Sequence, residues 1–227
     1  GRPTVAVRVP EHPVALGLLS AAGVPVAAPS ANRFGRVSPT TARHVVDELD
    51  GVYDLLLDGG PTTLGVESTV VDLTGDLPEM LRPGGVTLED LVAELGEVRH
   101  VGRAVTAPEQ AASAPGGLLR HYSPSTPLVL VEGGRRLPDQ LEHALRERGV
   151  DAVVLALPTD AERAARSLYA ALREADAAAV ALLLAPAFDP AGLGRAVTDR
   201  LYRAAPGRVV LDAMPATLDR LVAIAST

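Results

Sequence analysis

The sequence contains no cysteine, no lysine and no tryptophan among its 227 residues. The lack of cysteine excludes disulfide bonds, thiolate metal ligands and cysteine nucleophiles. All 21 basic side chains are therefore arginines, and aromatic residues make up only 3% of the chain. Because alanine, valine and leucine dominate, we attribute part of this composition to coding bias, and the arginine count by itself predicts no function.

Long apolar runs are lacking as well. No run is long enough to cross a bilayer, and 47% hydrophobic residues with a mean hydropathy of +0.19 are typical of a soluble globular chain. Together with the absence of cysteine, this composition favours a cytoplasmic location. The formal net charge of -7 argues against tight non-specific nucleic-acid binding, which needs a surplus of cations.

The first hundred residues combine short strands with helices. Three apolar segments predict strands: residues 4–9, 24–28 and 53–57. Ser38 followed by Pro39 predicts the cap and first position of an amphipathic helix. Thr87 with Asp90 three residues later has the pattern of a capping box, which predicts a second helix start.

A hairpin is predicted around Gly75. Residues 66–73 and 78–82 are the two strands, and an unbulged register centred on the turn places Ser68 opposite Arg82 on one face. A hydroxyl and a guanidinium in this arrangement can hold a carboxylate or a phosphate. A solvated cross-strand pair is the ordinary alternative and is favoured by the spacing alone.

The second half of the chain alternates regularly between strand and helix patterns. The predicted strands are residues 128–131, 152–157, 179–185 and 208–211, and the predicted helices are residues 140–148, 162–174, 193–204 and 217–223. Such alternation predicts a parallel sheet covered by helices. No G-x-G-x-x-G follows the first strand, so the Rossmann-like topology gives no reason to expect a dinucleotide.

Residues 102–127 lose this periodicity and are rich in alanine, proline, glycine and serine, which predicts a linker. The chain is thereby divided into a first domain, residues 1–101, and a second domain, residues 128–227. Within the linker, Tyr122 of "RHYSP" is an aromatic residue in a chain that has few. It either anchors the linker by burial or closes over a ligand.

Polar side chains gather after the predicted strand that ends at residue 28. Ser30 and Asn32 of "APSAN" lie at a carboxyl strand end, where open α/β sheets bind ligands, although a plain turn explains them as well. Thr40 belongs to a helix start whose amides and hydroxyls can bind an anion such as phosphate. Arg8 is a single arginine in a predicted strand, and such a side chain usually just reaches solvent.

The sequence offers no nucleophile motif and no metal-binding spacing. The segment "GVEST" lacks the second glycine of G-x-S-x-G, and the five histidines show no H-E-x-x-H spacing. The acidic residues form no compelling carboxylate pair. We therefore expect neither a protein nucleophile nor a metal ion held by the protein.

Five segments in this order carry a family resemblance: "RVPEHP", "APSANRFGRVSPTTA", "LDGGPTTLGVESTVVDL", "LRPG" and "RHYSP". They resemble threonylcarbamoyl-AMP synthases of the long form, and "GLGRAVTDRLYRAA" resembles the late helix of the second domain. The resemblance implies an α/β fold, with the C-terminal part of a YrdC-like twisted open-sheet domain followed by a small Rossmann-like parallel domain. The family's early segment, with its lysine- and arginine-containing motif, has no counterpart, and the chain begins at Gly1. We therefore expect an N-terminally truncated chain.

The resemblance also implies an activity. The family forms L-threonylcarbamoyladenylate from L-threonine, bicarbonate and ATP, releases pyrophosphate, and serves N6-threonylcarbamoyladenosine modification of tRNA. Its threonine-binding positions match Arg8, Ala28 and Ser68. Its ATP-binding positions match Ser30, Asn32, Thr40, Arg82 and Tyr122. The linker, residues 102–127, is then expected to fold back over the active site.

The implied chemistry is a nucleotidyl transfer that depends on positioning and charge neutralisation, with Mg²⁺ accompanying ATP. The implied partners are a downstream threonylcarbamoyl transferase and tRNA or other RNA, with no membrane. Three alternatives stay open: a non-catalytic RNA-binding module, a carbamoyl-transfer enzyme with a related domain, and a fragment that is itself inactive.

Overall fold

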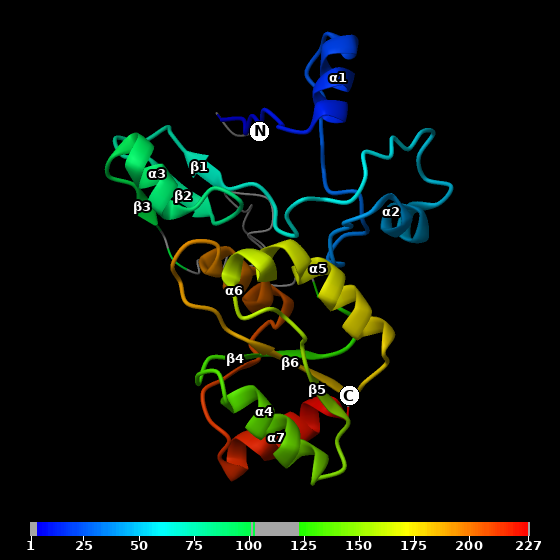
Figure 1. Cartoon of the computed structure of the whole chain (residues 1–227), viewed down its shortest axis with the longest axis vertical. Coiled ribbons are helices and arrows are strands. Elements are labelled where there is room, and N and C mark those ends of the chain that lie inside the picture. The colour runs from blue at the N-terminus through cyan, green and yellow to red at the C-terminus, as the bar shows by residue number, and fades with distance from the viewer. Residues whose placement is uncertain (1–3, 101, 103–122, 227) are drawn as a thin grey trace.

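The computed structural model describes residues 4–100, 102 and 123–226. The second half of the chain forms a four-stranded parallel sheet in the order β5-β6-β4-β7. Figure 1 labels β4, β5 and β6 of this sheet. Its strands are β4 (Leu128–Val131), β5 (Ala152–Val154), β6 (Leu182–Pro186) and β7 (Val209–Val210). The alternation seen in the sequence is confirmed, because each of these strands coincides with a predicted one.

Four helices cover the two faces of this sheet. They are α4 (Leu137–Arg146), α5 (Ala161–Ala177), α6 (Gly194–Ala204) and α7 (Pro215–Ala225). Successive residues of a strand point to opposite faces, so Leu130 packs with α5 and α6 while Val129 packs with α4 and α7. Both faces are buried, which explains why the strands are continuous apolar runs.

The first part of the chain contains a smaller sheet in the order β1-β2-β3. Strands β1 (Val70–Asp72) and β2 (Glu79–Arg82) are antiparallel, and β3 (Arg99–His100) runs parallel to β2. Helix α3 (Leu88–Leu95) connects β2 to β3. The predicted capping box at its start is confirmed, since Thr87 and Asp90 bond each other's backbone N–H groups.

Two other helices lie before this sheet, α1 (Pro13–Ala22) and α2 (Ala42–Leu49). The start of α2 differs from the prediction. Thr41 is its N-cap, because its hydroxyl accepts a hydrogen bond from the His44 N–H at 3.3 Å. Ser38 instead donates its hydroxyl to Glu67, so the side chain expected to cap the helix is used in a tertiary contact.

The three strands predicted at residues 4–9, 24–28 and 53–57 are not formed. A strand needs a neighbour to pair with its N–H and C=O groups, and the described residues provide none beside these segments. Most of their apolar side chains are therefore exposed, with Val5, Val7 and Val9 each 84% accessible.

The hairpin forms, but its register is shifted from the prediction. Arg82 lies opposite Val70 and not opposite Ser68, a displacement of two residues from the prediction. One residue comes from the turn, since Asp72 pairs with Glu79 and not with residue 78, and the other comes from the register shift between Val70 and Val71. A bulge of this kind adds one residue to one strand and displaces every pair beyond it. Ser68 precedes β1 and approaches Arg82 through its backbone.

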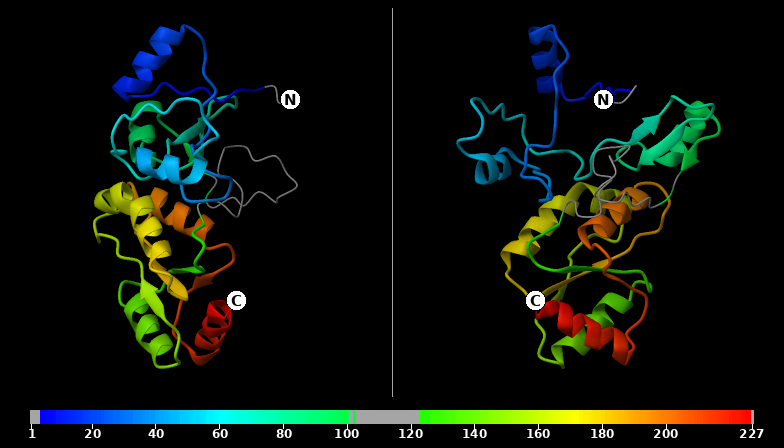
Figure 2. Two further views of the ribbon diagram at one scale, coloured as in Figure 1. Left: turned by 90° about the vertical axis from the view of Figure 1, so that its right-hand side faces the viewer. Right: turned by 180° about the vertical axis from the view of Figure 1, so that it is seen from behind.

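Helices α5 and α6 lie between the parallel sheet and the first part of the chain (Figures 1 and 2). They bury one face against the sheet and present the other to the loops before β1 and after β2. The α/β fold class with a Rossmann-like second part is thereby confirmed, and the junction of the two parts is built from the residues of these helices and loops.

Candidate functional site

The guanidinium of Arg82 forms two hydrogen bonds with the backbone of Ser68. It donates from Nε and Nη2 to the Ser68 carbonyl, at 3.2 and 2.8 Å. Arg82 is buried, whereas Ser68 is exposed with its hydroxyl outside this contact. The predicted cross-strand pair of Ser68 with Arg82 is not formed, and the two residues meet only through the backbone carbonyl of Ser68.

Thr40 is also buried and lies in a hydrogen-bonded turn. Its N–H donates to Nδ1 of His44 at 3.2 Å, and its carbonyl accepts from the Thr62 N–H at 2.9 Å. Partial burial, helped by the charge of Arg173, lowers the pKa of His44. A neutral imidazole is therefore available to accept from the Thr40 backbone at physiological pH.

Asn32 holds the loop that follows residue 30. Its Nδ2 donates to the carbonyls of Arg33 and Arg36, at 2.9 and 3.1 Å. Its Oδ1 is buried and accepts no hydrogen bond from any of the described residues. An acceptor left without a donor costs free energy, so this oxygen is suited to a ligand that donates an N–H or O–H.

The remaining predicted residues make none of the contacts described above. Arg8 and Ala28 are exposed in segments that form no strand, and Ser30 is exposed in the loop before Asn32. Tyr122 lies outside the described residues.

Glu67 is the residue of this region that sequence reasoning missed. Its carboxylate accepts from the Tyr169 hydroxyl at 2.8 Å, from the Ser38 hydroxyl at 3.0 Å and from Nε of Arg200 at 2.6 Å. Burial opposes ionisation, but Arg200 outweighs it by charge and hydrogen bonding, and the pKa of Glu67 falls to about 2. The signal was its position immediately before Ser68 inside "GVEST".

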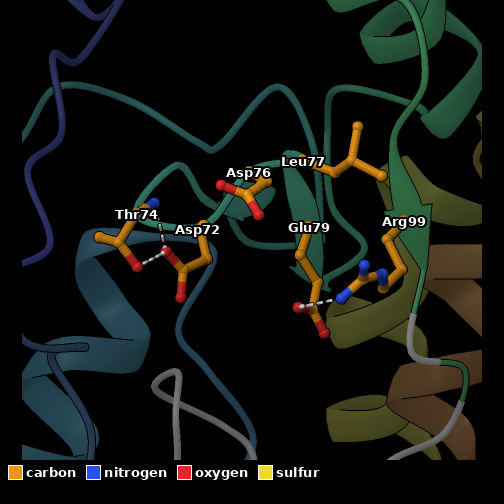
Figure 3. Close-up of a pocket in the computed structure, with 7 residues that line it drawn as sticks. Asp72, Thr74, Asp76, Leu77, Glu79 and Arg99 are labelled. Atoms are coloured by element: carbon orange, nitrogen blue, oxygen red, sulfur yellow. Dashed lines mark hydrogen bonds and ion pairs between the residues drawn. The ribbon is translucent and has the colours of Figure 1, made fainter.

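A shallow depression lies at the tip of the hairpin, away from all of these residues (Figure 3). Its volume is about 230 Å³. Its lining residues are Asp72, Thr74, Gly75, Asp76, Leu77, Glu79 and Arg99. Asp72 accepts from Thr74, and Glu79 lies 3.9 Å from Arg99, so two of its acidic groups are engaged locally. The depression contains none of the predicted site residues.

The described residues contain no group of three or more His, Asp or Glu side chains that could hold a metal ion. Among the same residues, no helix is long and apolar enough to span a membrane. The candidate site consists of the polar loops at residues 32–40, 65–68 and 82–85, which carry Asn32, Thr40, Ser68 and Arg82. Their amide, hydroxyl and guanidinium groups suit an anionic or hydrogen-bonding small molecule.

The fold and these loops define a two-part α/β protein whose candidate ligand site lies where the parts meet. Residues 1–84 match the family described as telomere recombination, and residues 86–206 match the family described as threonylcarbamoyl-AMP synthase, C-terminal domain. The chain belongs to the threonylcarbamoyl-AMP synthase family.

Individual relatives agree with this assignment. The chain is 38% identical to the threonylcarbamoyl-AMP synthase of Bacillus subtilis and 40% identical to that of Pyrococcus abyssi, in each case over 92% of its own length. It covers 65% and 66% of those two proteins, so it spans about two thirds of the length of the relatives it matches.

A solved structure matches as well. The crystal structure of Pyrococcus abyssi Sua5 complexed with L-threonine superposes with a TM-score of 0.83 at 38% identity. The match covers 91% of this chain and 65% of that one. The fold described above is therefore the fold of this family over nearly all of the chain.

Proposed function

We propose that this chain belongs to an enzyme that makes L-threonylcarbamoyladenylate from L-threonine, bicarbonate and ATP and releases pyrophosphate. The observation that carries the proposal is its 38–40% identity to threonylcarbamoyl-AMP synthases over 92% of the chain. The relative solved in complex with L-threonine, with its TM-score of 0.83, supports the same amino acid as substrate. The product would serve threonylcarbamoyl modification of tRNA in the cytoplasm.

The proposed division of labour follows the predicted domains. Residues 1–101 form the YrdC-like catalytic domain, residues 102–127 form a linker that folds over the site, and residues 128–227 form the Rossmann-like domain. We assign L-threonine to Arg8, Ala28 and Ser68, and ATP to Ser30, Asn32, Thr40, Arg82 and Tyr122. The unused acceptor of Asn32 and the hydrogen bond from Arg82 to the Ser68 carbonyl support this assignment.

The reaction needs no protein nucleophile. The amine nitrogen of L-threonine bonds to the carbon of bicarbonate, water leaves, and the resulting carbamate oxygen attacks the α-phosphorus of ATP. The bond between that phosphorus and the bridging oxygen breaks, and pyrophosphate carries away the electron pair. The protein's share is to align the two substrates and to stabilise the negative charge that develops.

In this proposal Mg²⁺ enters with ATP and is part of the substrate. The residues assigned to ATP are hydroxyls, an amide and a guanidinium, which suit phosphate oxygens better than a cation. The guanidinium of Arg82 is the positive group that these residues offer, and its buried position reduces screening by water. Pairing to the Ser68 carbonyl fixes its plane.

The test is pyrophosphate release from ATP, with L-threonine and bicarbonate omitted in turn and the Bacillus subtilis relative as positive control. Release that needs both co-substrates supports the proposal. A chain that neither releases pyrophosphate nor binds L-threonine or ATP, under conditions where the relative does, contradicts it for this chain. Titration with tRNA at several salt concentrations decides the RNA-binding alternative.

A further inference from the structure

Arg200 of helix α6 is fully buried at the junction of the two parts, with 0% of its side chain exposed. Its Nη1 donates to Asp199 at 2.7 Å within the same helix. Its other two groups cross to the first part of the chain: Nε donates to Glu67 at 2.6 Å, and Nη2 donates to the Pro83 carbonyl at 2.9 Å. A single guanidinium thus holds two separate loops of the other part.

These two loops are two of the three that form the candidate site. Glu67 immediately precedes Ser68, and Pro83 immediately follows Arg82. The loops also lie against each other, because a Cβ atom added at Gly84 would lie 2.3 Å from the Glu67 carbonyl oxygen. Any movement of Arg200 is therefore transmitted to the residues assigned to L-threonine and to ATP.

Helix α5 holds the neighbouring segment in the same way. Nη2 of Arg173 donates to the Val37 carbonyl and to Glu48, and Nε donates to the Ser38 carbonyl at 3.4 Å. Ser38 in turn donates to Glu67. The segment that leads to Thr40 is thus tied to the same carboxylate that Arg200 binds.

A network of this kind is an inefficient way to gain stability. Removing charged groups from water costs about as much as their attraction returns, and apolar residues of similar size often stabilise a protein at least as well. What the network does provide is a single geometry, because the planar guanidinium must satisfy Glu67, Asp199 and Pro83 at once. This property is what a substrate site requires from the residues behind it.

We propose that Arg200 is a positioning residue of the synthase site: through Glu67 and Pro83 it fixes Ser68 and Arg82 in the relative placement that binds substrate. The substrate part of this inference rests on the proposed function. It gives the Rossmann-like part of the chain a role, since its helix α6 forms the rear support of the site without touching substrate.

The experiment compares Arg200→Met with Arg195→Met. Arg195 lies on the same helix and also pairs across the junction, with Glu89 at 3.3 Å, but Glu89 is exposed and belongs to helix α3, outside the site loops. Hydrogen exchange is measured over residues 66–69 and 80–86, and L-threonine affinity is measured by calorimetry. We expect Arg200→Met to speed exchange in both segments and to weaken L-threonine binding by about ten-fold, and Arg195→Met to change neither.

Two further variants separate positioning from folding. Arg200→Lys keeps the buried charge but cannot donate to three partners in one plane, so we expect it to preserve protection in β4 and β6 while still weakening L-threonine binding. Glu67→Gln keeps the size of the side chain and removes its charge. If Arg200→Met fails to fold, Glu67→Gln tests the positioning role in its place. We expect Glu67→Gln to speed hydrogen exchange at residues 66–69.

The two proposals can fail separately. If the unaltered chain binds no L-threonine while the Bacillus subtilis relative does, the proposed function fails for this chain, and the exchange data still decide whether Arg200 holds the two loops. If Arg200→Lys and Glu67→Gln both leave exchange in residues 66–69 and 80–86 and L-threonine affinity within about two-fold of the unaltered chain, the positioning role is overturned.

Discussion

The carboxylate of Glu67 accepts hydrogen bonds from a loop serine, from Tyr169 of α5 and from Arg200 of α6. Each donor stabilises the ionised form, and together they overcome the cost of burying the charge. Because the side chain is only 21% exposed, solvent screens these interactions less than it would at the surface. Protonation of Glu67 therefore weakens the contacts that join the two parts of the chain.

Stability should consequently depend on pH through Glu67. Its pKa is about 2 in the folded chain and 4.5 in the reference state, so its contribution is complete above about pH 4.5 and is lost as pH falls towards 2. The lowered pKa corresponds to a contribution on the order of 3 kcal/mol. Denaturant unfolding from pH 7 to pH 3 should show Glu67→Gln to be less stable at neutral pH and less sensitive to acid than the unaltered chain.

The matched control for this experiment is Glu97→Gln, which removes an exposed carboxylate. It should leave both the neutral stability and the acid sensitivity unchanged. An acid response of Glu67→Gln that equals the response of the unaltered chain would show that Glu67 is not the group responsible.

Gly84 lets the turn after β2 approach the chain at Glu67 and Ser68. A Cβ atom there would lie 2.3 Å from the Glu67 carbonyl oxygen and 2.4 Å from the Ser68 carbonyl carbon, and backbone atoms cannot rotate away. Gly84→Ala should therefore destabilise the chain by about 1–3 kcal/mol, as overpacking does. It should also weaken L-threonine binding, because the two loops would be forced apart.

Gly75 in the turn of the same hairpin provides the control. A Cβ atom there meets nothing closer than 3.8 Å, so Gly75→Ala should be accommodated. Thermal unfolding of both variants checks the prediction. Equal melting temperatures would mean that the close approach at Gly84 is not needed.

At the scale of elements, the sequence correctly predicted the features that depend on residues close together in the chain. The apolar alternation of the second half correctly indicated β4, and the capping box correctly indicated α3, because both signals are local. The predicted register of the hairpin was wrong, since neither the one-residue offset at the turn nor the bulge between Val70 and Val71 leaves a clear trace in a pattern of period two. The strands predicted at residues 4–9, 24–28 and 53–57 were wrong because a strand depends on a partner that local propensity does not supply.

The candidate site shows the same limit. The sequence placed Ser68 near Arg82 because a short hairpin connects them, although the predicted cross-strand pair is not formed. The ion pair of Glu67 with Arg200 joins residues separated by 133 positions, and no local pattern indicates such a contact. Only the docking of α5 and α6 onto the loops of the first part brings the supporting charges to the site.

The whole molecule combines two regions that differ in burial. The second part has apolar cores on both faces of its sheet, where Leu130, Leu182 and Leu184 are 0% exposed. Residues 4–28 contain no buried side chain, and none of the ten residues of α1 is buried. An isolated helix of this length is marginal in water, so we expect the two regions to open with very different free energies.

Hydrogen exchange of the intact chain checks this expectation. Amides of β4 and β6 should exchange only through global unfolding, and their exchange should accelerate steeply when a little urea is added, because global unfolding exposes a large surface. Amides of residues 4–28 should exchange rapidly and show little response to urea. The buried pair of Glu67 and Arg200 places residues 65–68 with the stable region, although they lie in the first part of the chain. Rapid, urea-insensitive exchange at residues 65–68 would separate these residues from the second part and remove the physical basis for α6 as the support of the site.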